Sequence, residues 1–426
     1  MKVLVIGSGG REDALVWKIA QSKRVKKIYA APGNAGIAQT AKCLPINADD
    51  IKGLYDFAVD KKIDLTVVGP EVPLVSGIVD LFRKGGLRIF GPDTFCAQLE
   101  GSKVFAKELA DKFGIPTAEF KVFTNSAQAK AHIERMGAPC VVKADGLAAG
   151  KGVIVASTVE QARRAVEQIM EEKVFGKSGQ RVIVEERLVG EEASIMAVTD
   201  GDNILTLASS QDHKRAYDND EGENTGGMGA YSPAGLVKEE ILQETVDKII
   251  LPTIKGLSAM GHRFTGVLYA GIMIVEGSIK FLEFNVRLGD PETQAILPRL
   301  KGDIVELMER AIDGTLSSVK LEWDERPSLC VVLASGGYPG SYTKGGIIEG
   351  LDSAGKLKDV ILFHAGTKLS PDKKYITDGG RVLGVTALGN SLADAFERAY
   401  NAVSMIKFDG MHYRRDIGRK ALARRV

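Results

Sequence analysis

The sequence has few cysteine and histidine residues, and none of them is spaced like a metal ligand. Its four cysteines, Cys43, Cys96, Cys140 and Cys330, lie far apart in or beside apolar runs and form no CxxC pair. The five histidines are scattered along the chain. Zinc sites need closely spaced ligand pairs, and disulfide frameworks belong to oxidising compartments. We therefore expect buried, reduced thiols, no transition-metal site and a reducing, cytoplasmic environment.

The chain also lacks an excess of charge of either sign, a long apolar run and any polar or repetitive tract. Its 56 lysines and arginines balance 55 aspartates and glutamates, so no global field attracts nucleic acid or an acidic membrane. The first residues, MKVLVIGSGG, hold an apolar run that stops at glycines and is too short for a signal peptide or a membrane span. We expect a globular protein with neither a nucleic-acid nor a membrane partner, in which local groups hold any bound anion.

At 426 residues the chain is longer than one hydrophobic core usually supports, so we expect two to four domains. Residues 1–101 alternate short apolar runs with helical periodicity, as an open parallel α/β domain does. Residues 102–325 follow, and they include a small region, 120–189, of a size that suits a mobile lid. Residues 326–426 indicate a mixed, β-rich C-terminal domain. The predicted class is therefore multidomain, α/β followed by α+β, with strands near 2–6, 28–31, 65–68, 88–90, 181–186, 330–334, 360–365 and 382–388 and helices near 161–170 and 393–406.

A first glycine loop, Gly7-Ser8-Gly9-Gly10, lies between an expected strand and an expected helix. Main-chain N–H groups and the helix dipole favour an anion at such a turn, which predicts a phosphate site with Arg11 beside it. A dinucleotide fingerprint needs a third glycine where Glu12 stands and an acidic residue after the next strand, which here ends in YAAP. NAD is therefore disfavoured, and the alternative is a tight turn without a ligand.

A second glycine-rich segment, residues 141–155, has β-branched runs on both sides and is expected to form a strand, a loop and a strand. A Walker A loop needs four residues between its glycines, whereas three separate Gly146 from Gly150, and Gly152 follows the next lysine. Such a flap can lie over a triphosphate, with N–H groups and Lys143 neutralising charge. A flexible hairpin is the alternative.

A third loop, residues 222–230, contains Gly226 and Gly227 and follows the polar stretch QDHKR. Both segments are too polar to belong to a core. By itself this pattern indicates a surface loop.

An acidic strand is predicted over residues 279–287. Period-two alternation puts Phe281, Glu283, Asn285 and Arg287 on one face, and Phe284 on the other. Carboxylate and amide oxygens are ligands that Mg²⁺ prefers, and arginine suits a bidentate grip on a carboxylate. The alternative is a half-exposed strand with a solvated charged face.

Several motifs are collinear with those of one family: GSGGREDAL at 7–15, PGNAG at 32–36, VGPEVPLV at 68–75, VKADGLAAGKGV at 142–153, EGENTGGMGAYSP at 221–233 and EFNVRLGDPETQ at 283–294. With SGGYPGSYTKG, HAGT and GGRVLGVTALG near the C-terminus, the chain resembles the phosphoribosylamine–glycine ligase family over essentially its whole length. This resemblance implies an ATP-grasp fold and a reaction that joins glycine to 5-phosphoribosylamine. It further implies ATP with Mg²⁺ or Mn²⁺ as cofactors, a glycyl phosphate intermediate, a step of purine synthesis, and a monomer or small homo-oligomer.

The resemblance also assigns roles by motif position. The nucleotide would meet Lys103, Lys143, Gly150 and Gly152 at its phosphates, Glu185, Glu186 and Leu188 at the adenine, and Glu191 at the ribose. The metal would be held by Glu283 and Asn285. The candidate catalytic residues are Lys143, Arg287 and Asp212, and the candidate substrate-binding residues are Gly7, Gly9, Gly10, Arg11, Gly226 and Gly227.

Some residues depart from the pattern of the family. Asp13 stands where histidine is usual, Glu223 where proline is usual, and Leu288 where phenylalanine is usual. The expected strand 268–272 carries no acidic residue, so the alternatives are a metal site with fewer protein ligands and one that Glu292 or Asp290 assists. The alternative hypotheses are another ATP-grasp enzyme, which carboxylates or formylates a different acid, and a nucleotide-binding regulatory or oxidoreductase-like α/β protein.

Overall fold

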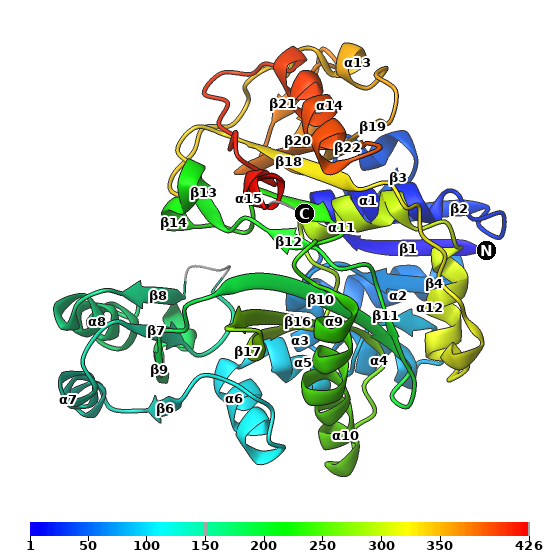
Figure 1. Cartoon of the computed structure of the whole chain (residues 1–426). Helices are drawn as coiled ribbons and strands as arrows, with labels where there is room; N and C mark the ends of the chain where they lie inside the picture. Colours follow the sequence, from blue (N-terminus) through cyan, green and yellow to red (C-terminus); the bar gives the residue numbers. More distant parts are fainter. Residues whose placement is uncertain (149–151, 425–426) are drawn as a thin grey trace.

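The computed structural model describes residues 1–148 and 152–424. The N-terminal region is an open parallel sheet with strand order β3-β2-β1-β4-β5, and helices cover its two faces (Figure 1). The short, Val- and Ile-rich runs are fully buried in it, as expected of parallel strands covered on both sides. Its elements are β1 (Lys2–Gly7), α1 (Gly10–Ile19), β2 (Lys27–Pro32), η1 (Ile37–Gln39), β3 (Lys42–Cys43), α2 (Ile51–Lys61), β4 (Leu65–Val68), α3 (Glu71–Val75), α4 (Ile78–Lys84), β5 (Ile89–Phe90) and α5 (Thr94–Gly101).

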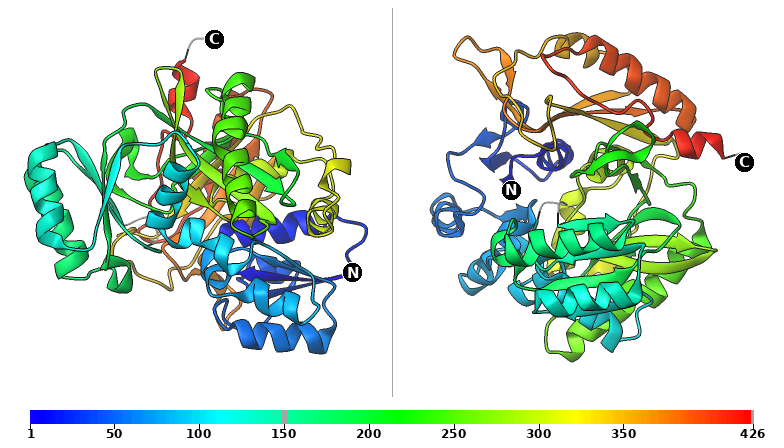
Figure 2. Two further views of the ribbon diagram at one scale, coloured as in Figure 1. Left: turned by 90° about the horizontal axis from the view of Figure 1, so that it is seen from below. Right: turned by 90° about the vertical axis from the view of Figure 1, so that its left-hand side faces the viewer.

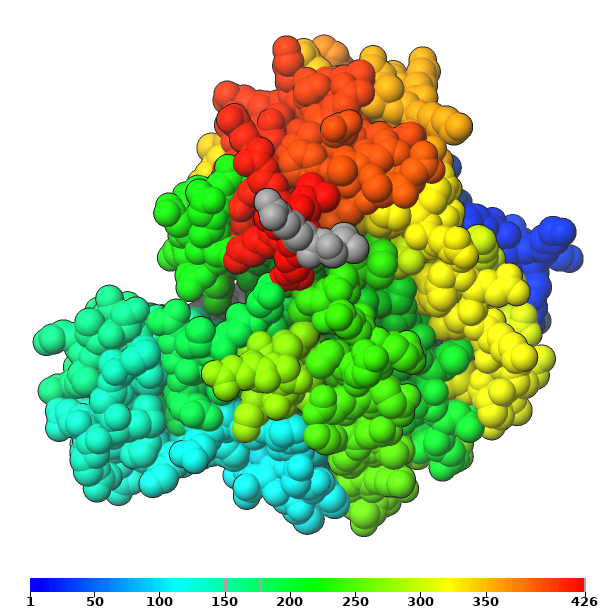
Figure 3. Space-filling model, in the orientation of Figure 1, coloured from blue at the N-terminus to red at the C-terminus, as the bar shows by residue number. Residues whose placement is uncertain are grey.

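A small unit, residues 120–186, follows α6 (Lys103–Lys112) and projects from the rest of the molecule, and we call it the lid after its predicted role (Figures 1 and 3). Its antiparallel sheet has the order β6-β9-β7-β8, and two helices pack on one face. The lid has a hydrophobic cluster of its own, separate from the other clusters. Its elements are β6 (Phe120–Phe123), α7 (Ser126–Met136), β7 (Cys140–Ala144), β8 (Val153–Ala156), α8 (Val159–Val166), the π-helical turn η2 (Glu167–Glu171), η3 (Gly176–Gly179) and β9 (Val182–Glu186).

The central region is built on a second antiparallel sheet of order β11-β10-β16-β17. One hydrophobic cluster joins it to the N-terminal sheet, with Leu4 and Phe82 packed together with Leu268 and Phe281. A two-stranded ribbon, β13–β14, stands apart from this sheet. The elements are β10 (Glu191–Thr199), β11 (Ile204–Thr206), β13 (Arg215–Tyr217), η4 (Asp218–Asp220), β14 (Glu221–Asn224), α9 (Glu239–Thr245), η5 (Val246–Ile250), α10 (Leu251–Ala259), β16 (Gly266–Val275) and β17 (Ser278–Asn285).

The C-terminal sheet, of order β12-β15-β18-β22-β19, lies above the other two regions, and α14 covers it (Figures 1 and 2). Two of its strands, β12 and β15, precede residue 325 in the chain. The domain boundary expected at that residue stays a prediction. The elements are β12 (Gln211–Asp212), β15 (Gly229–Ser232), α11 (Glu292–Ile296), η6 (Leu297–Arg299), α12 (Ile304–Ile312), η7 (Leu316–Ser318), β18 (Ser328–Ala334), α13 (Leu351–Ala354), β19 (Val360–His364), β20 (Thr367–Leu369), β21 (Tyr375–Thr377), β22 (Arg381–Leu388), α14 (Leu392–Met405) and α15 (Arg419–Ala423).

The predicted fold class is confirmed: a parallel N-terminal sheet is followed by antiparallel sheets in the central and C-terminal regions. The expected strands and helices form, with ends that differ by a few residues. Cys43 is half-buried, whereas the other three cysteines are buried as expected. Among the described residues, no helix is long and apolar enough to cross a membrane.

Candidate functional site

A cavity of about 1080 Å³ lies where the N-terminal region, the lid and the central sheet meet. It also touches the C-terminal region through Tyr338 and Arg381. Among the predicted site residues, Gly10 and Gly227 do not line it, and Gly150 lies outside the described residues. The predicted residues that do line it are Gly7, Gly9, Arg11, Lys103, Lys143, Gly152, Glu185, Glu186, Leu188, Glu191, Asp212, Gly226, Glu283, Asn285 and Arg287.

The first glycine loop surrounds a carboxylate that belongs to the protein itself. The Gly9 N–H donates to Oε2 of Glu12 at 2.6 Å, and Arg11 Nε donates to Oε1 of Glu12, also at 2.6 Å. A side chain on Gly9 would meet this carboxylate, because an added β-carbon would lie 2.8 Å from Oε2. Gly10 packs against Gln294 instead of facing the cavity. The loop therefore has glycines where a carboxylate lies close to the backbone, but the N–H of Gly9 already donates to Glu12.

Two buried lysines share the carboxylate of Glu185 on β9. Lys143 on β7 forms an ion pair with its Oε1, and Lys107 on α6 lies 2.7 Å from its Oε2. Although burial opposes it, these two cations hold the pKa of the Glu185 carboxyl below its usual range. Burial lowers the pKa of Lys107 to about 8. The side chain of Glu185 is thus bound to two lysines on the cavity wall, and its assignment to the adenine stays a prediction.

Lys107 was not predicted as a site residue. It follows Lys103 by four residues on one helix, so both project from the same helix face, and this spacing is the signal in the sequence that could have found it. Lys103 donates to the carbonyl of Gly146 at 2.9 Å, and burial lowers its pKa. The structure therefore brings three lysines, from α6 and β7, to one side of the cavity.

Glu283 on β17 faces a fourth lysine, Lys214, at 3.2 Å between Nζ and Oε1. The positive charge of Lys214 is the main reason that the pKa of Glu283 falls to about 2. Although burial works in the opposite direction, Glu283 and Glu192 raise the pKa of Lys214 well above its usual range. Lys214 was missed because it lies in a polar stretch that, without the fold, indicates only a surface loop.

The strict alternation predicted for residues 279–287 is wrong at Phe281. A β-bulge interrupts the pairing of β16 with β17, since Gly271 pairs with Glu283 and the next residue, Ile272, pairs with Phe281. The extra residue reverses the alternation, so Phe281 packs against Phe284 with ring centroids 4.1 Å apart. Both rings belong to the core, and the bulge leaves Glu283 on the wall of the cavity.

Arg287 is held by carboxylates of the protein rather than being free for a substrate. Its Nη2 lies 2.7 Å from Glu100 and donates to Oδ1 of Asn285 at 3.1 Å, and its Nε lies 3.4 Å from Glu71. Although burial opposes it, Glu100 and Glu71 raise the pKa of the guanidinium. In this arrangement Arg287 orients Asn285.

The two acidic residues expected to assist a metal already have partners in the protein. Glu292 Oε1 accepts hydrogen bonds from Tyr269 at 2.6 Å and from Ser194 at 3.2 Å. Oδ1 of Asp290 lies 3.3 Å from Nη1 of Arg381. Among the described residues, no group of three or more Cys, His, Asp or Glu side chains is arranged to hold a metal. All four of these oxygen-bearing residues, Glu283, Asn285, Asp290 and Glu292, line the cavity, and the assignment of the metal to Glu283 and Asn285 stays a prediction.

Asp212 lies on the cavity wall close to the third loop. Its Oδ1 accepts the N–H of His213 at 2.6 Å, and burial, followed by the charge of Glu292, raises its pKa well above the usual range. Gly227 has a φ of 114°, and an added β-carbon would lie 2.7 Å from Oδ1 of Asp212. Glycine is thus required beside Asp212, although Gly227 does not itself reach the cavity.

The hinge between the lid and β10 is engaged with other parts of the chain. Glu186 Oε1 accepts the N–H of Glu119 at 3.0 Å, and Glu191 forms an ion pair with Arg424. Both carboxylates line the cavity. Their assignment to adenine and ribose stays a prediction.

Asp13, where the sequence departs from the family, joins the N-terminal helix to the C-terminal sheet by accepting the N–H of His364 at 2.6 Å. Burial raises its pKa to about 7. The folded state therefore binds a proton that the unfolded chain releases near pH 4, so stability is greatest below that pH and falls as the pH rises toward 7.

We expect Asp13→Asn to remove this pH dependence, because an amide oxygen still accepts the N–H but carries no charge. Between pH 5 and pH 8, the free energy of unfolding of the variant should exceed that of the parent by about 1–3 kcal/mol. Urea unfolding midpoints at the two pH values measure this gain. A parent protein whose midpoint does not fall between these values would contradict the assignment.

Three family profiles match the chain in order. They are described as Phosphoribosylglycinamide synthetase, N domain (residues 1–100), ATP-grasp (A) domain (101–293) and C domain (328–420). A phosphoribosylamine–glycine ligase of Escherichia coli (strain K12) is 53% identical over 430 residues, which cover 100% of this chain and 99% of the relative.

Solved structures agree with this match. The phosphoribosylamine–glycine ligase of Thermotoga maritima superimposes with a TM-score of 0.85 at 32% identity, covering 98% of this chain and 100% of that chain. The biotin carboxylase domain of Hydrogenobacter thermophilus 2-oxoglutarate carboxylase has a TM-score of 0.73 at 17% identity, covering 97% and 91%, which is a likeness of fold alone. Because all three profiles and a full-length relative match in order, the chain belongs to the phosphoribosylglycinamide synthetase family, whose central domain has the ATP-grasp fold.

Proposed function

We propose that this protein is an ATP-dependent ligase that joins glycine to 5-phosphoribosylamine and releases glycinamide ribonucleotide, ADP and phosphate. Its family membership over the whole chain supports this proposal. The observation that carries it is the single cavity at which the first glycine loop, the lid and the acidic strand converge. A ligation that consumes ATP needs nucleotide, acid and amine side by side, and such positioning supplies much of the rate.

The reaction runs in two balanced steps. A carboxylate oxygen of glycine attacks the γ-phosphorus of ATP, a new O–P bond forms and ADP leaves, which gives glycyl phosphate. The amine nitrogen of 5-phosphoribosylamine then attacks the acyl carbon, the C–N bond forms, phosphate leaves and the nitrogen loses a proton. Activation is needed because an amine does not displace oxide from a carboxylate, and no side-chain nucleophile is required.

The lysine side of the cavity is proposed to hold the triphosphate. Lys103 is half-buried and Lys143 is buried, and Lys143 is fixed by Glu185 on β9, the neighbouring strand of the lid sheet. Gly152 belongs to the flap that would cover the phosphates, and the hinge residues Glu186 and Leu188 would contact the adenine. Preorganised cations of this kind stabilise charge that develops during phosphoryl transfer.

A divalent cation, Mg²⁺ or Mn²⁺, fits Glu283 and Asn285. Glu283 is ionised at neutral pH because its pKa is about 2, and Asn285 contributes an amide oxygen that Arg287 orients. Hard oxygens of this type suit such cations, which usually take few protein ligands and complete their shells with water and phosphate. When bound, the cation would offset negative charge on the phosphates.

Asp212 is proposed to accept the proton that the amine loses. Its raised pKa makes the carboxylate a better base than an ordinary aspartate, and it lies on the cavity wall. The phosphate of 5-phosphoribosylamine is proposed to bind at Gly7 and Gly9 with Arg11 nearby. Binding there requires Glu12 to release the N–H of Gly9. Closure of the lid would exclude water from glycyl phosphate.

Phosphate release from ATP tests the function directly. We expect release at the full rate only when glycine and 5-phosphoribosylamine are both present, with glycinamide ribonucleotide as the product identified by mass. Omission of either substrate should reduce the rate to background. Release that instead follows bicarbonate with biotin, or formate, would overturn the proposal and favour another ATP-grasp enzyme.

A further inference from the structure

The β13–β14 ribbon forms one wall of the cavity but has little support from its own sheet. Its two strands pair with each other and, among the described strands, with no other. An isolated two-stranded hairpin is marginally stable in water. Lys214 immediately precedes β13 and Thr225 follows β14, and both line the cavity. Whatever holds the ribbon therefore also sets the place of Lys214 opposite Glu283.

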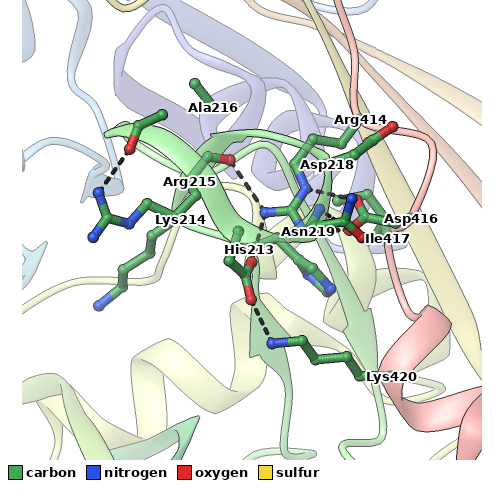
Figure 4. A network of polar contacts seen from close by, with 12 residues as sticks. His213, Lys214, Arg215, Ala216, Asp218, Asn219, Arg414, Asp416, Ile417 and Lys420 are labelled. Carbon is green, nitrogen blue, oxygen red and sulfur yellow. Dashed lines mark hydrogen bonds and ion pairs between the residues drawn. The ribbon is translucent and has the colours of Figure 1, made fainter.

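A segment near the C-terminus, His412–Lys420, lies along this ribbon, and we call it the C-terminal strap; Figure 4 shows its residues Arg414, Asp416, Ile417 and Lys420. It bonds to successive parts of the ribbon and not to one end alone. The contacts are His412 Nε2 with Ala216 O at 2.8 Å, Arg415 N with Asp218 Oδ1 at 2.7 Å, Asp416 Oδ2 with Asn219 N at 2.9 Å, and an ion pair of Lys420 with Asp220.

Arg414 is the centre of these contacts, and its side chain is 1% exposed. Its Nη1 donates to the carbonyl of Arg215 at 3.2 Å and to Oδ1 of Asp220 at 2.8 Å. Its Nε and Nη2 reach the two oxygens of Asp416 at 2.7 and 2.8 Å. The planar guanidinium thus joins the first residue of β13, the turn of the ribbon and the strap, and the ammonium of a lysine cannot reproduce this fork.

The strap also fixes the base of the ribbon. The N–H of Gly418 donates to Nε2 of His213 at 3.2 Å, and His213 stands between Asp212 and Lys214. The ribbon itself adds little to the hydrophobic core, because Tyr217 is 53% exposed and residues 221–223 are exposed. Loss of the strap contacts should therefore free the ribbon locally without unfolding the sheets beneath it.

We propose that Arg414 is a positioning residue for the ligation, holding the β13–β14 ribbon so that Lys214 meets Glu283 across the cavity. Arg414 is not part of the cavity lining, so it acts through the ribbon and not on a substrate. The inference rests on the proposed function, because the rate that Arg414 is expected to affect is that of the proposed ligation. It adds that the end of the chain, far in sequence from the acidic strand, shapes the site.

Arg414→Gln in the full chain tests this role. Hydrogen exchange of the amides of residues 215–224 should become faster, while that of β10 and β18 stays as in the parent. The kcat for ligation should fall at least about tenfold, equivalent to about 1.4 kcal/mol, while the dissociation constant for ATP changes less than about twofold. Arg414→Lys, which keeps the charge but loses the fork, should show an intermediate kcat.

Arg398→Gln is the matched control, because Arg398 also forms two ion pairs in the C-terminal region, with Asp394 and Asp359, away from the ribbon. Three outcomes would each overturn the proposal. They are hydrogen exchange of the ribbon that stays unchanged in Arg414→Gln, a loss of ATP affinity in Arg414→Gln as large as its loss of kcat, and a loss of kcat in Arg398→Gln as large as that in Arg414→Gln. If Arg414→Gln does not fold, Asp416→Asn gives the same comparison. Exchange and ATP binding do not depend on which acid and amine are joined, so failure of the proposed function would remain distinguishable.

Discussion

Glu283→Gln is expected to lower the kcat for ligation by about two to three orders of magnitude. The substitution removes the negative charge that faces Lys214, Lys103 and Lys143, while the amide keeps the size of the side chain. It also removes the charged oxygen ligand proposed for the divalent cation. The loss should therefore appear in the chemical step and in the concentration of Mg²⁺ needed for half-maximal activity, which should rise.

Steady-state assays of phosphate release over a range of Mg²⁺ concentrations measure both effects. Glu276→Gln is the control, because Glu276 is exposed in the turn between β16 and β17 and the net charge changes equally. A Glu283→Gln protein that folds and retains more than about a tenth of the parental kcat would show that this carboxylate is not part of the site.

Lys143→Met is expected to lower kcat/KM for ATP by about a hundredfold or more. Lys143 is proposed to neutralise the triphosphate, and methionine keeps most of the aliphatic length without the charge. The buried carboxylate of Glu185 would keep Lys107 as its remaining cation. We therefore also expect the free energy of unfolding to fall by about 1–3 kcal/mol.

Lys121→Met on β6 is the comparison for this variant, since Lys121 lies exposed on the same lid. Enzyme kinetics and urea unfolding on both variants separate the two effects of Lys143. A variant that loses stability but keeps kcat/KM for ATP would assign Lys143 to the structure of the lid alone. Loss of activity in both variants would point to the lid as a whole.

Much of the fold could be predicted because the signals are local. Apolar runs such as Lys2–Gly7 and Leu65–Val68 become buried parallel strands, and β7 and β8 pair antiparallel as the β-branched runs of residues 141–155 predict. Local signals of this kind do not define domain boundaries, and the boundary expected at residue 325 stays a prediction. β15, from the middle of the chain, pairs with β18, and this pairing depends on contacts between distant segments.

The candidate site was predicted where a motif carries its chemistry in consecutive residues. Lys143, Glu283 and Asn285 were selected in this way, and the structure brings them to one cavity. Side chains whose role comes from a distant partner were missed. Lys107 and Lys214 are of this kind, since each pairs with a carboxylate on a strand far away in the sequence.

The amino-acid sequence by itself determined the order of the elements, the glycine-rich turns and the family, because these depend on local periodicity and on motifs in a fixed order. The tertiary structure alone decided what each charged group faces. It placed Glu12 in the first loop, Arg287 against Glu100, Phe281 in the core through a bulge, and Arg414 under the ribbon. The physical reason is that the strength of a charge or hydrogen bond depends on burial and on the partner, and both are fixed only when distant segments pack together.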